Sequence, residues 1–82
     1  MKAVELGELL ESLGVPILGY RENDGYLGAS VRVTDNVHVE IADEGAISVV
    51  AHNARGLQLY AARTEVNELI CDLVEAGALV LH

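Results

Sequence analysis

The sequence has no tryptophan and no phenylalanine, and its only aromatic residues are three tyrosines. Proteins that bind single-stranded nucleic acid by stacking need several aromatic platforms, so this mode of binding is not expected. A core must come from aliphatic side chains instead, and hydrophobic residues make up 51% of the chain. Because this content is too high for disorder and 82 residues are too few for two cores, residues 1–82 are expected to form a single domain.

Positive charge is scarce. Five Lys and Arg residues stand against thirteen Asp and Glu residues, which gives a formal net charge of −8 at pH 7. Proteins that bind nucleic acid directly cluster Lys and Arg to neutralise phosphates, and anionic membranes attract the same residues. We therefore expect no direct nucleic-acid binding and no membrane binding, and the charge favours a basic protein surface as the partner.

Cysteine and long apolar runs are also nearly absent. The single cysteine, Cys71, cannot form an internal disulfide, and Glu5, Glu8 and Glu11 interrupt the region where a signal peptide needs an apolar stretch. Uninterrupted apolar stretches such as Ala78 to Leu81 fall far short of the roughly 20 residues that span a bilayer. The sequence thus predicts a soluble protein of the reducing cytoplasm.

Two segments carry the pattern of amphipathic helices. From Val4 to Leu13 the apolar residues follow the spacing i, i+3, i+4, i+7 of one helix face, namely Leu6, Leu9, Leu10 and Leu13. Gly14 and Pro16 predict the end of this helix. A second helix is expected after an N-cap at Thr64 and before Gly77, with the same spacing in Val66, Leu69, Ile70, Leu73 and Val74.

The segment between these helices alternates apolar with polar or small residues, which is typical of strands. The alternating residues are Val31 and Val33, then Val37, Val39 and Ile41, then Ile47, Val49 and Ala51. Short connections rich in Asn, Asp and Gly separate the runs and predict antiparallel hairpins. Leu57 to Tyr60 form either a fifth strand or an irregular segment before the second helix, and Ala78 to Leu81 predict a short terminal strand.

One strand register is open at this level. A two-residue turn at Asp24-Gly25 pairs Tyr20 with Ala29 and turns the tyrosine toward the helices. A three-residue loop pairs Tyr20 with Gly28 and turns it outward, because a shift of one residue exchanges the two faces of a strand. We favour the two-residue turn.

Together the elements predict an α+β fold of two layers, with an antiparallel sheet of four to five strands and the N-terminal and C-terminal helices packed on one face. The opposite face would be half polar and open to water or to a partner. Its residues would be Arg32, His38, Glu40, Ser48, Val50 and His52.

Each predicted helix carries carboxylates on the side away from its apolar stripe. These candidate protein-binding residues are Glu5, Glu8 and Glu11 on the first helix, and Glu65, Glu68, Asp72 and Glu75 on the second. No Lys or Arg lies between Thr64 and His82, although lysines at i+4 would stabilise the helix. Two interpretations remain open, a solvated acidic surface and a surface that binds a basic partner, because the charge density is close to that of one DNA strand.

No metal site is expected on the sheet. His38, Glu40 and His52 share one face, but a three-residue turn at Asp43 to Gly45 places the two imidazoles diagonally across Val50 with no third ligand near both. Arg32 and His38 should oppose one another across a hairpin. We interpret that pair as part of a polar sheet face rather than as a phosphate clamp.

No enzyme or cofactor motif is found either. Cys71 lies near Glu68, Asp72 and Glu75, and negative neighbours disfavour the reactive thiolate, so a packing role is expected. The serines have no nucleophile elbow and no histidine partner, and the glycines follow no phosphate-loop pattern. We therefore predict a protein that is not an enzyme and holds no cofactor.

In size, acidity and order of elements, though in no residue motif, the chain resembles the small inhibitors of phages and mobile elements, anti-CRISPR proteins among them. The resemblance implies an acidic face that blocks the basic channel through which a CRISPR effector engages DNA. The chain is also similar to small acidic secretion chaperones, which bind a client through a sheet face or strand edge. A third interpretation is an adaptor that associates through Val50 and Tyr60, and either a monomer or a homodimer is compatible with these alternatives.

Overall fold

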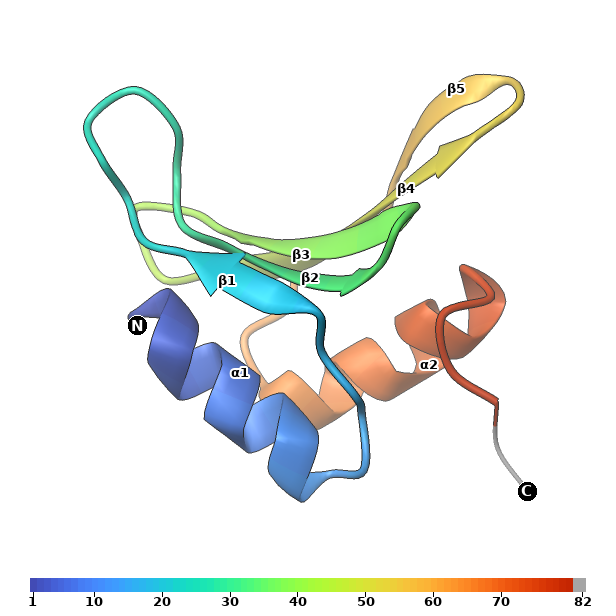
Figure 1. Ribbon diagram of the computed structural model, residues 1–82, viewed down its shortest axis with the longest axis horizontal. Helices are drawn as coiled ribbons and strands as arrows, with labels where there is room; N and C mark the ends of the chain where they lie inside the picture. The colour runs from blue at the N-terminus through green and yellow to red at the C-terminus, as the bar shows by residue number, and fades with distance from the viewer. Residues whose placement is uncertain (81–82) are drawn as a thin grey trace.

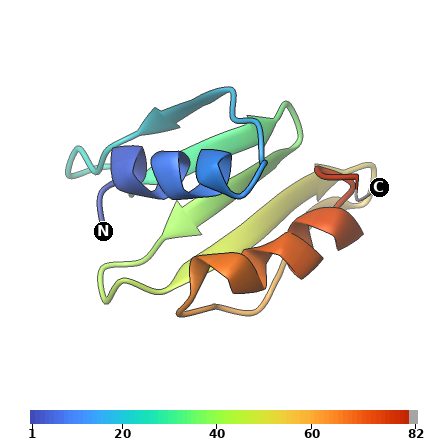
Figure 2. The same cartoon turned by 90° about the horizontal axis from the view of Figure 1, so that it is seen from below.

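The computed structural model describes residues 1–80, which form one antiparallel sheet with two α-helices on a single face (Figures 1 and 2). In chain order the elements are α1 (Ala3–Ser12), β1 (Gly19–Arg21), β2 (Ser30–Thr34), β3 (Val37–Ile41), β4 (Ile47–Asn53), β5 (Gly56–Leu59), the 3-10 helix η1 (Val66–Glu68) and α2 (Leu69–Glu75). The five strands lie in the order β1-β2-β3-β4-β5, so each strand pairs with its neighbour in sequence. The predicted two-layer α+β fold is confirmed.

Helix α1 packs against β1 and β2, but with a different face from the one predicted. Its buried residues are Ala3, Leu6, Gly7 and Leu10, whereas Leu9 and Leu13 are 44% and 46% exposed. Gly7 explains the rotation, because a Cβ on it would lie 2.9 Å from Cδ1 of Ile17. The absence of a side chain lets the helix approach the chain that leads into β1, and the leucines on one flank are left half exposed.

The N-terminus of α1 is held by a side chain from outside the helix, and its C-terminus ends at a glycine. The Glu22 carboxylate accepts hydrogen bonds from the N–H groups of Ala3 at 2.7 Å and Val4 at 3.2 Å, which satisfies donors that have no partner inside the helix. At the other end Gly14 has a φ of 87°, the left-handed conformation predicted from the sequence.

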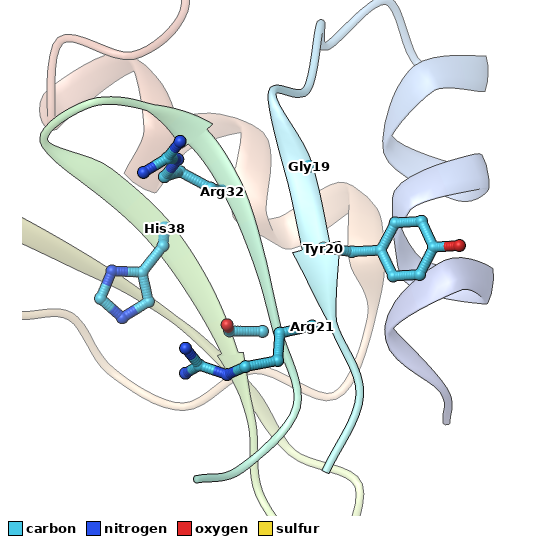
Figure 3. A pocket seen from close by; sticks show the side chains of 6 residues that line it. Gly19, Tyr20, Arg21, Arg32 and His38 are labelled. Atoms are coloured by element: carbon cyan, nitrogen blue, oxygen red, sulfur yellow. The ribbon is translucent and has the colours of Figure 1, made fainter. Parts of the chain in front are cut away.

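The strand registers follow the predicted turns, except at β1. Ile41 pairs with Ile47 around the three-residue turn Asp43 to Gly45, as expected. Tyr20, however, pairs with Val31 rather than with Ala29 or Gly28, because the connection is a longer loop. The loop is held by Asp24, whose side chain accepts hydrogen bonds from the N–H groups of Tyr26 and Leu27. Tyr20 still faces the helices, as the favoured alternative required, and lies beside α1 (Figure 3).

The C-terminal third of the described chain departs from the sequence pattern at two points. The segment from Gly56 to Leu59 is a fifth strand, as one of the two alternatives for this region predicted. The helical segment begins with η1 after an N-cap at Glu65, so Thr64 is not the cap. Residues 78–80 form no strand, which corrects the prediction of a terminal strand, and Leu81 lies outside the described residues.

The core is entirely aliphatic. Valines supply the inner face of the sheet and leucines supply the helices, as the lack of Phe and Trp requires. The largest side chains that are fully buried are Leu6, Leu10, Ile47, Leu69, Leu73, Val15, Val31, Val39 and Val49. Because a domain of this size buries little surface, each of these side chains contributes a large share of the stability.

Replacing Leu10 with Ala should destabilise the protein by about 2–5 kcal/mol, since it removes buried methyl groups and leaves a cavity. Leu9→Ala is the matched control on the next residue of the same helix and should cost about 1 kcal/mol or less, because Leu9 is 44% exposed. Urea denaturation followed by circular dichroism measures both changes. Equal losses would show that α1 does not pack through the face described.

Candidate functional site

The first acidic row lies along the outside of α1. Glu5, Glu8 and Glu11 are all exposed, as predicted, and no ion pair within residues 1–80 involves them. Successive members are three residues apart, which corresponds to a rise of about 4.5 Å along the helix axis. The row is therefore a set of carboxylates that the fold itself does not use.

The second acidic row is not the exposed set that the sequence predicted, because Asp72 is buried and only 3% exposed. Its carboxylate accepts hydrogen bonds from Nε and Nη2 of Arg63, at 2.9 and 3.0 Å. This contact with Asp72 raises the pKa of the Arg63 guanidinium. Cys71, expected at the edge of the core, is exposed instead.

The 3-10 turn η1 gives the physical reason for this exchange. A 3-10 helix turns about 120° per residue and an α-helix about 100°, so a pattern drawn with one period from Glu65 onward loses its phase within one turn. Glu68 at the end of η1 is also engaged, since its carboxylate accepts a hydrogen bond from the Glu65 N–H at 3.1 Å. Glu65 and Glu68 are exposed but together form the capping box of η1, so Glu75 is the member of this row that is exposed and has no contact of this kind in residues 1–80.

The outer face of the sheet has the two-histidine arrangement that its register predicted. His38 pairs with Val50, and the N–H of His52 donates to the carbonyl of Asn36, so the imidazoles are diagonal neighbours with ring centroids 5.6 Å apart. Nε2 of His38 lies 3.1 Å from Oε1 of Glu40. Within the described chain no group of three His, Cys, Asp or Glu side chains is placed to hold a metal ion.

Arginines gather on the same outer face, a feature that the sequence reading did not identify. Arg21 and Arg32 point away from the helices together with His38, and with Ser30 and Gly19 they surround a shallow hollow of about 350 Å³ that Tyr20 borders (Figure 3). No ion pair within residues 1–80 involves either arginine. The favoured alternative for β1 turns Tyr20 toward the helices and so turns Arg21 outward, but the sequence does not show that Arg21 lies diagonally beside Arg32, because the loop after β1 sets that register.

Two apolar or aromatic groups are exposed beyond these charged surfaces. Leu57 and Leu59 of the edge strand β5 are 63% and 72% exposed and lie next to Val50 and His52 on the outer face. Tyr60, which the sequence placed with Val50 in a contact surface, instead packs against the core. Val50, which the sequence placed on the open face, is only 2% exposed, so the outer apolar group consists of Leu57 and Leu59.

The loop between β1 and β2 places Tyr26 at its tip, where the side chain is 97% exposed. Asp24 orders this loop, and the N–H groups of Leu27 and Tyr26 lower the pKa of the Asp24 carboxyl, with a smaller contribution from the charge of Arg21. The Asp24 carboxylate thus fixes the conformation of the loop, and Tyr26 is its exposed aromatic side chain.

Comparison with known proteins gives no relative from which a role could be transferred. No protein-family model, no curated protein and no solved structure matches the chain. Neither helix in residues 1–80 is long and apolar enough to cross a membrane. The function must be argued from the charged surfaces themselves.

Replacing Asp72 with Asn should lower the midpoint of urea denaturation, because Asn offers one acceptor oxygen where the Arg63 guanidinium has two donors to satisfy. Glu75→Gln, which removes the same charge from an exposed position on α2, should leave the midpoint nearly unchanged. Equal effects of the two substitutions would mean that Asp72 is one more surface carboxylate.

Proposed function

We propose that this chain is a non-enzymatic binding protein that sets the acidic row of α1 against a basic, nucleic-acid-binding surface of a partner protein. The observation that carries the proposal is the separation of charge. Glu5, Glu8 and Glu11 are exposed and unpaired on the helix side, while the unpaired arginines Arg21 and Arg32 lie on the opposite face of the sheet.

The carboxylates of α1 are available for this role because the fold gives them none. Glu22, Glu68 and Asp72 each accept hydrogen bonds that hold a helix or its preceding turn. The α1 row does nothing comparable, and like charges at this spacing slightly destabilise a helix. Lys2 precedes the helix, but no ion pair within residues 1–80 involves the three carboxylates, which supports a use outside the chain, on a surface rich in Lys and Arg.

A basic surface that binds nucleic acid presents its cations to a line of phosphates. Along the duplex axis one DNA strand presents a phosphate about every 3.4 Å, and the α1 carboxylates rise by about 4.5 Å, so the two charge densities are of the same order. Binding would exclude the nucleic acid by competition for the same cations. A CRISPR effector is a partner of this kind, which is the specific form of the proposal that the resemblance to anti-CRISPR inhibitors suggests.

A second candidate is a chaperone or adaptor that holds an apolar client. It rests on the edge strand β5, which is exposed along its whole length and carries Leu57 and Leu59 beside Val50. A client strand could pair with this edge and place alternate side chains on the outer apolar group. The hairpin of β4 and β5 also extends away from the helices, which leaves the edge accessible (Figure 1).

The leading proposal predicts that the triple variant Glu5→Lys, Glu8→Lys, Glu11→Lys loses its partner. Protein captured from a host lysate should bind nucleic acid, should be released by added DNA or RNA, and should bind at least about tenfold more weakly at high than at low salt. The control Asp35→Lys, Asp43→Lys, Glu44→Lys changes the net charge equally, in the strand turns, and should retain the partner. Equal loss in both variants would refute a specific role of α1.

The second candidate predicts a different pattern with a permanently unfolded, apolar model client. The variant Leu57→Asp, Leu59→Asp should abolish binding, and wild-type affinity should change little with salt because the contact is apolar. Leu27→Asp alters another exposed leucine, at 52% exposure, and serves as the control. Absence of client binding by the wild-type protein would leave the acidic-row proposal alone.

A further inference from the structure

The outer face of the sheet places its side chains in rows that cross the strands. In one row Gly19 of β1 opposes Arg32 of β2, which in turn opposes His38 of β3. In the next row Arg21 opposes Ser30. Directly opposed residues share a face, so two arginines and a histidine surround two of the smallest residues in the sheet.

This arrangement explains the hollow of about 350 Å³ that these residues line (Figure 3). Gly19 has no side chain, and nothing lies within 4 Å of the position where its Cβ would be. Ser30 fills little of the adjoining space. Arg21 and Arg32 are diagonal neighbours, with Cα atoms about 7–8 Å apart, so both guanidinium groups can extend over Gly19 and Ser30, which form the floor of the hollow.

Neither arginine at the hollow has an ion-pair partner in the described chain. Although the sequence has thirteen Asp and Glu residues, none of those in residues 1–80 forms an ion pair with Arg21 or Arg32. Glu40 lies opposite Ser30 on the same face, but its carboxylate contacts His38, and Asp24 is held by the N–H groups of its own loop. The two guanidinium groups therefore line the hollow without an ion-pair partner of their own.

We propose that this hollow binds the phosphate group of a small molecule, held by Arg21 and Arg32 with Ser30 and His38 as further hydrogen-bonding groups. A phosphate monoester carries close to two negative charges at pH 7 and so matches both guanidinium groups, whereas a carboxylate matches one. Arginine is also the side chain best suited to phosphate, because its planar donors bind two oxygens at once.

The size of the hollow favours a phosphate ester over the free ion. About 350 Å³ lies near the lower end of the range for small-molecule pockets, so it leaves room for a short organic group beside the phosphate. This group would lie over Gly19, where the floor is open. The site is on the face opposite α1 and does not depend on the acidic row.

The test is a titration of the full chain, followed by ¹H–¹⁵N NMR, with inorganic phosphate, glycerol 3-phosphate and acetate at constant ionic strength. Physiological ionic strength is used because the Debye length is then about 8 Å, which screens repulsion by the distant carboxylates. We expect saturable shifts at the amides of Gly19, Ser30 and Arg32, and a Kd for glycerol 3-phosphate of about 1 mM or tighter. Acetate should bind at least about tenfold more weakly.

Four substitutions separate the site from general charge effects. Arg21→Gln and Arg32→Gln should each weaken phosphate binding at least about tenfold, whereas Arg55→Gln, an exposed arginine in the turn between β4 and β5, should not. Gly19→Leu should block binding by filling the hollow while the thermal unfolding curve stays that of the folded protein, since space is available for the side chain.

Three results would overturn the proposal. The first is the absence of saturable shifts with both phosphate compounds. The second is equal binding of acetate and glycerol 3-phosphate, and the third is equal weakening by Arg55→Gln and Arg32→Gln, because each of these two would reduce the effect to nonspecific charge. Tighter binding of glycerol 3-phosphate than of inorganic phosphate would support the ester, and equal binding of the two would support a site for the phosphate group alone.

Discussion

Both helices cover one face of the sheet and leave the other bare, and the rest of the molecule depends on this asymmetry (Figure 2). Side chains alternate along a strand, so each strand residue is committed to one face. Because valines such as Val31, Val39 and Val49 fill the covered face, the charged residues between them are placed on the bare face. Arg21 and Arg32 therefore lie on the opposite side of the sheet from the carboxylates of α1.

The thirteen carboxylates of this chain divide into two groups by their contacts rather than by their sequence spacing. Glu22, Glu68 and Asp72 hold helix ends and an arginine, and each is tied to N–H donors. The α1 row has no such contacts. Some of the carboxylates are thus required by the fold, and only those without such contacts are available to bind a partner.

The two proposed sites lie on opposite faces, so they need not exclude one another. A partner protein on the helix side would leave the hollow over Gly19 and Ser30 accessible. An aliphatic core of buried valines and leucines separates the two sites. Occupation of the hollow would stabilise the folded chain by mass action, whichever partner α1 binds.

The sequence by itself determined the elements whose signals are local. Alternation and turn residues placed β2, β3 and β4 and their registers, and glycines such as Gly14 and Gly77 ended the helices, because these features depend on neighbours a few residues apart. Tertiary structure decided the rest. The rotation of α1 follows from the contact of Gly7 with Ile17, and the burial of Asp72 from its pairing with Arg63, which no periodicity encodes.

The hollow on the outer face is another feature that only the tertiary structure decided. Its residues come from three strands, and the loop after β1 sets whether Arg21 joins Arg32 or faces the helices. The shape of that loop is fixed by hydrogen bonds that the Asp24 carboxylate accepts from N–H groups of the loop, so its length could not be predicted from turn propensities alone. Local sequence fixes which face alternate residues share, but the register between distant strands fixes which charges meet.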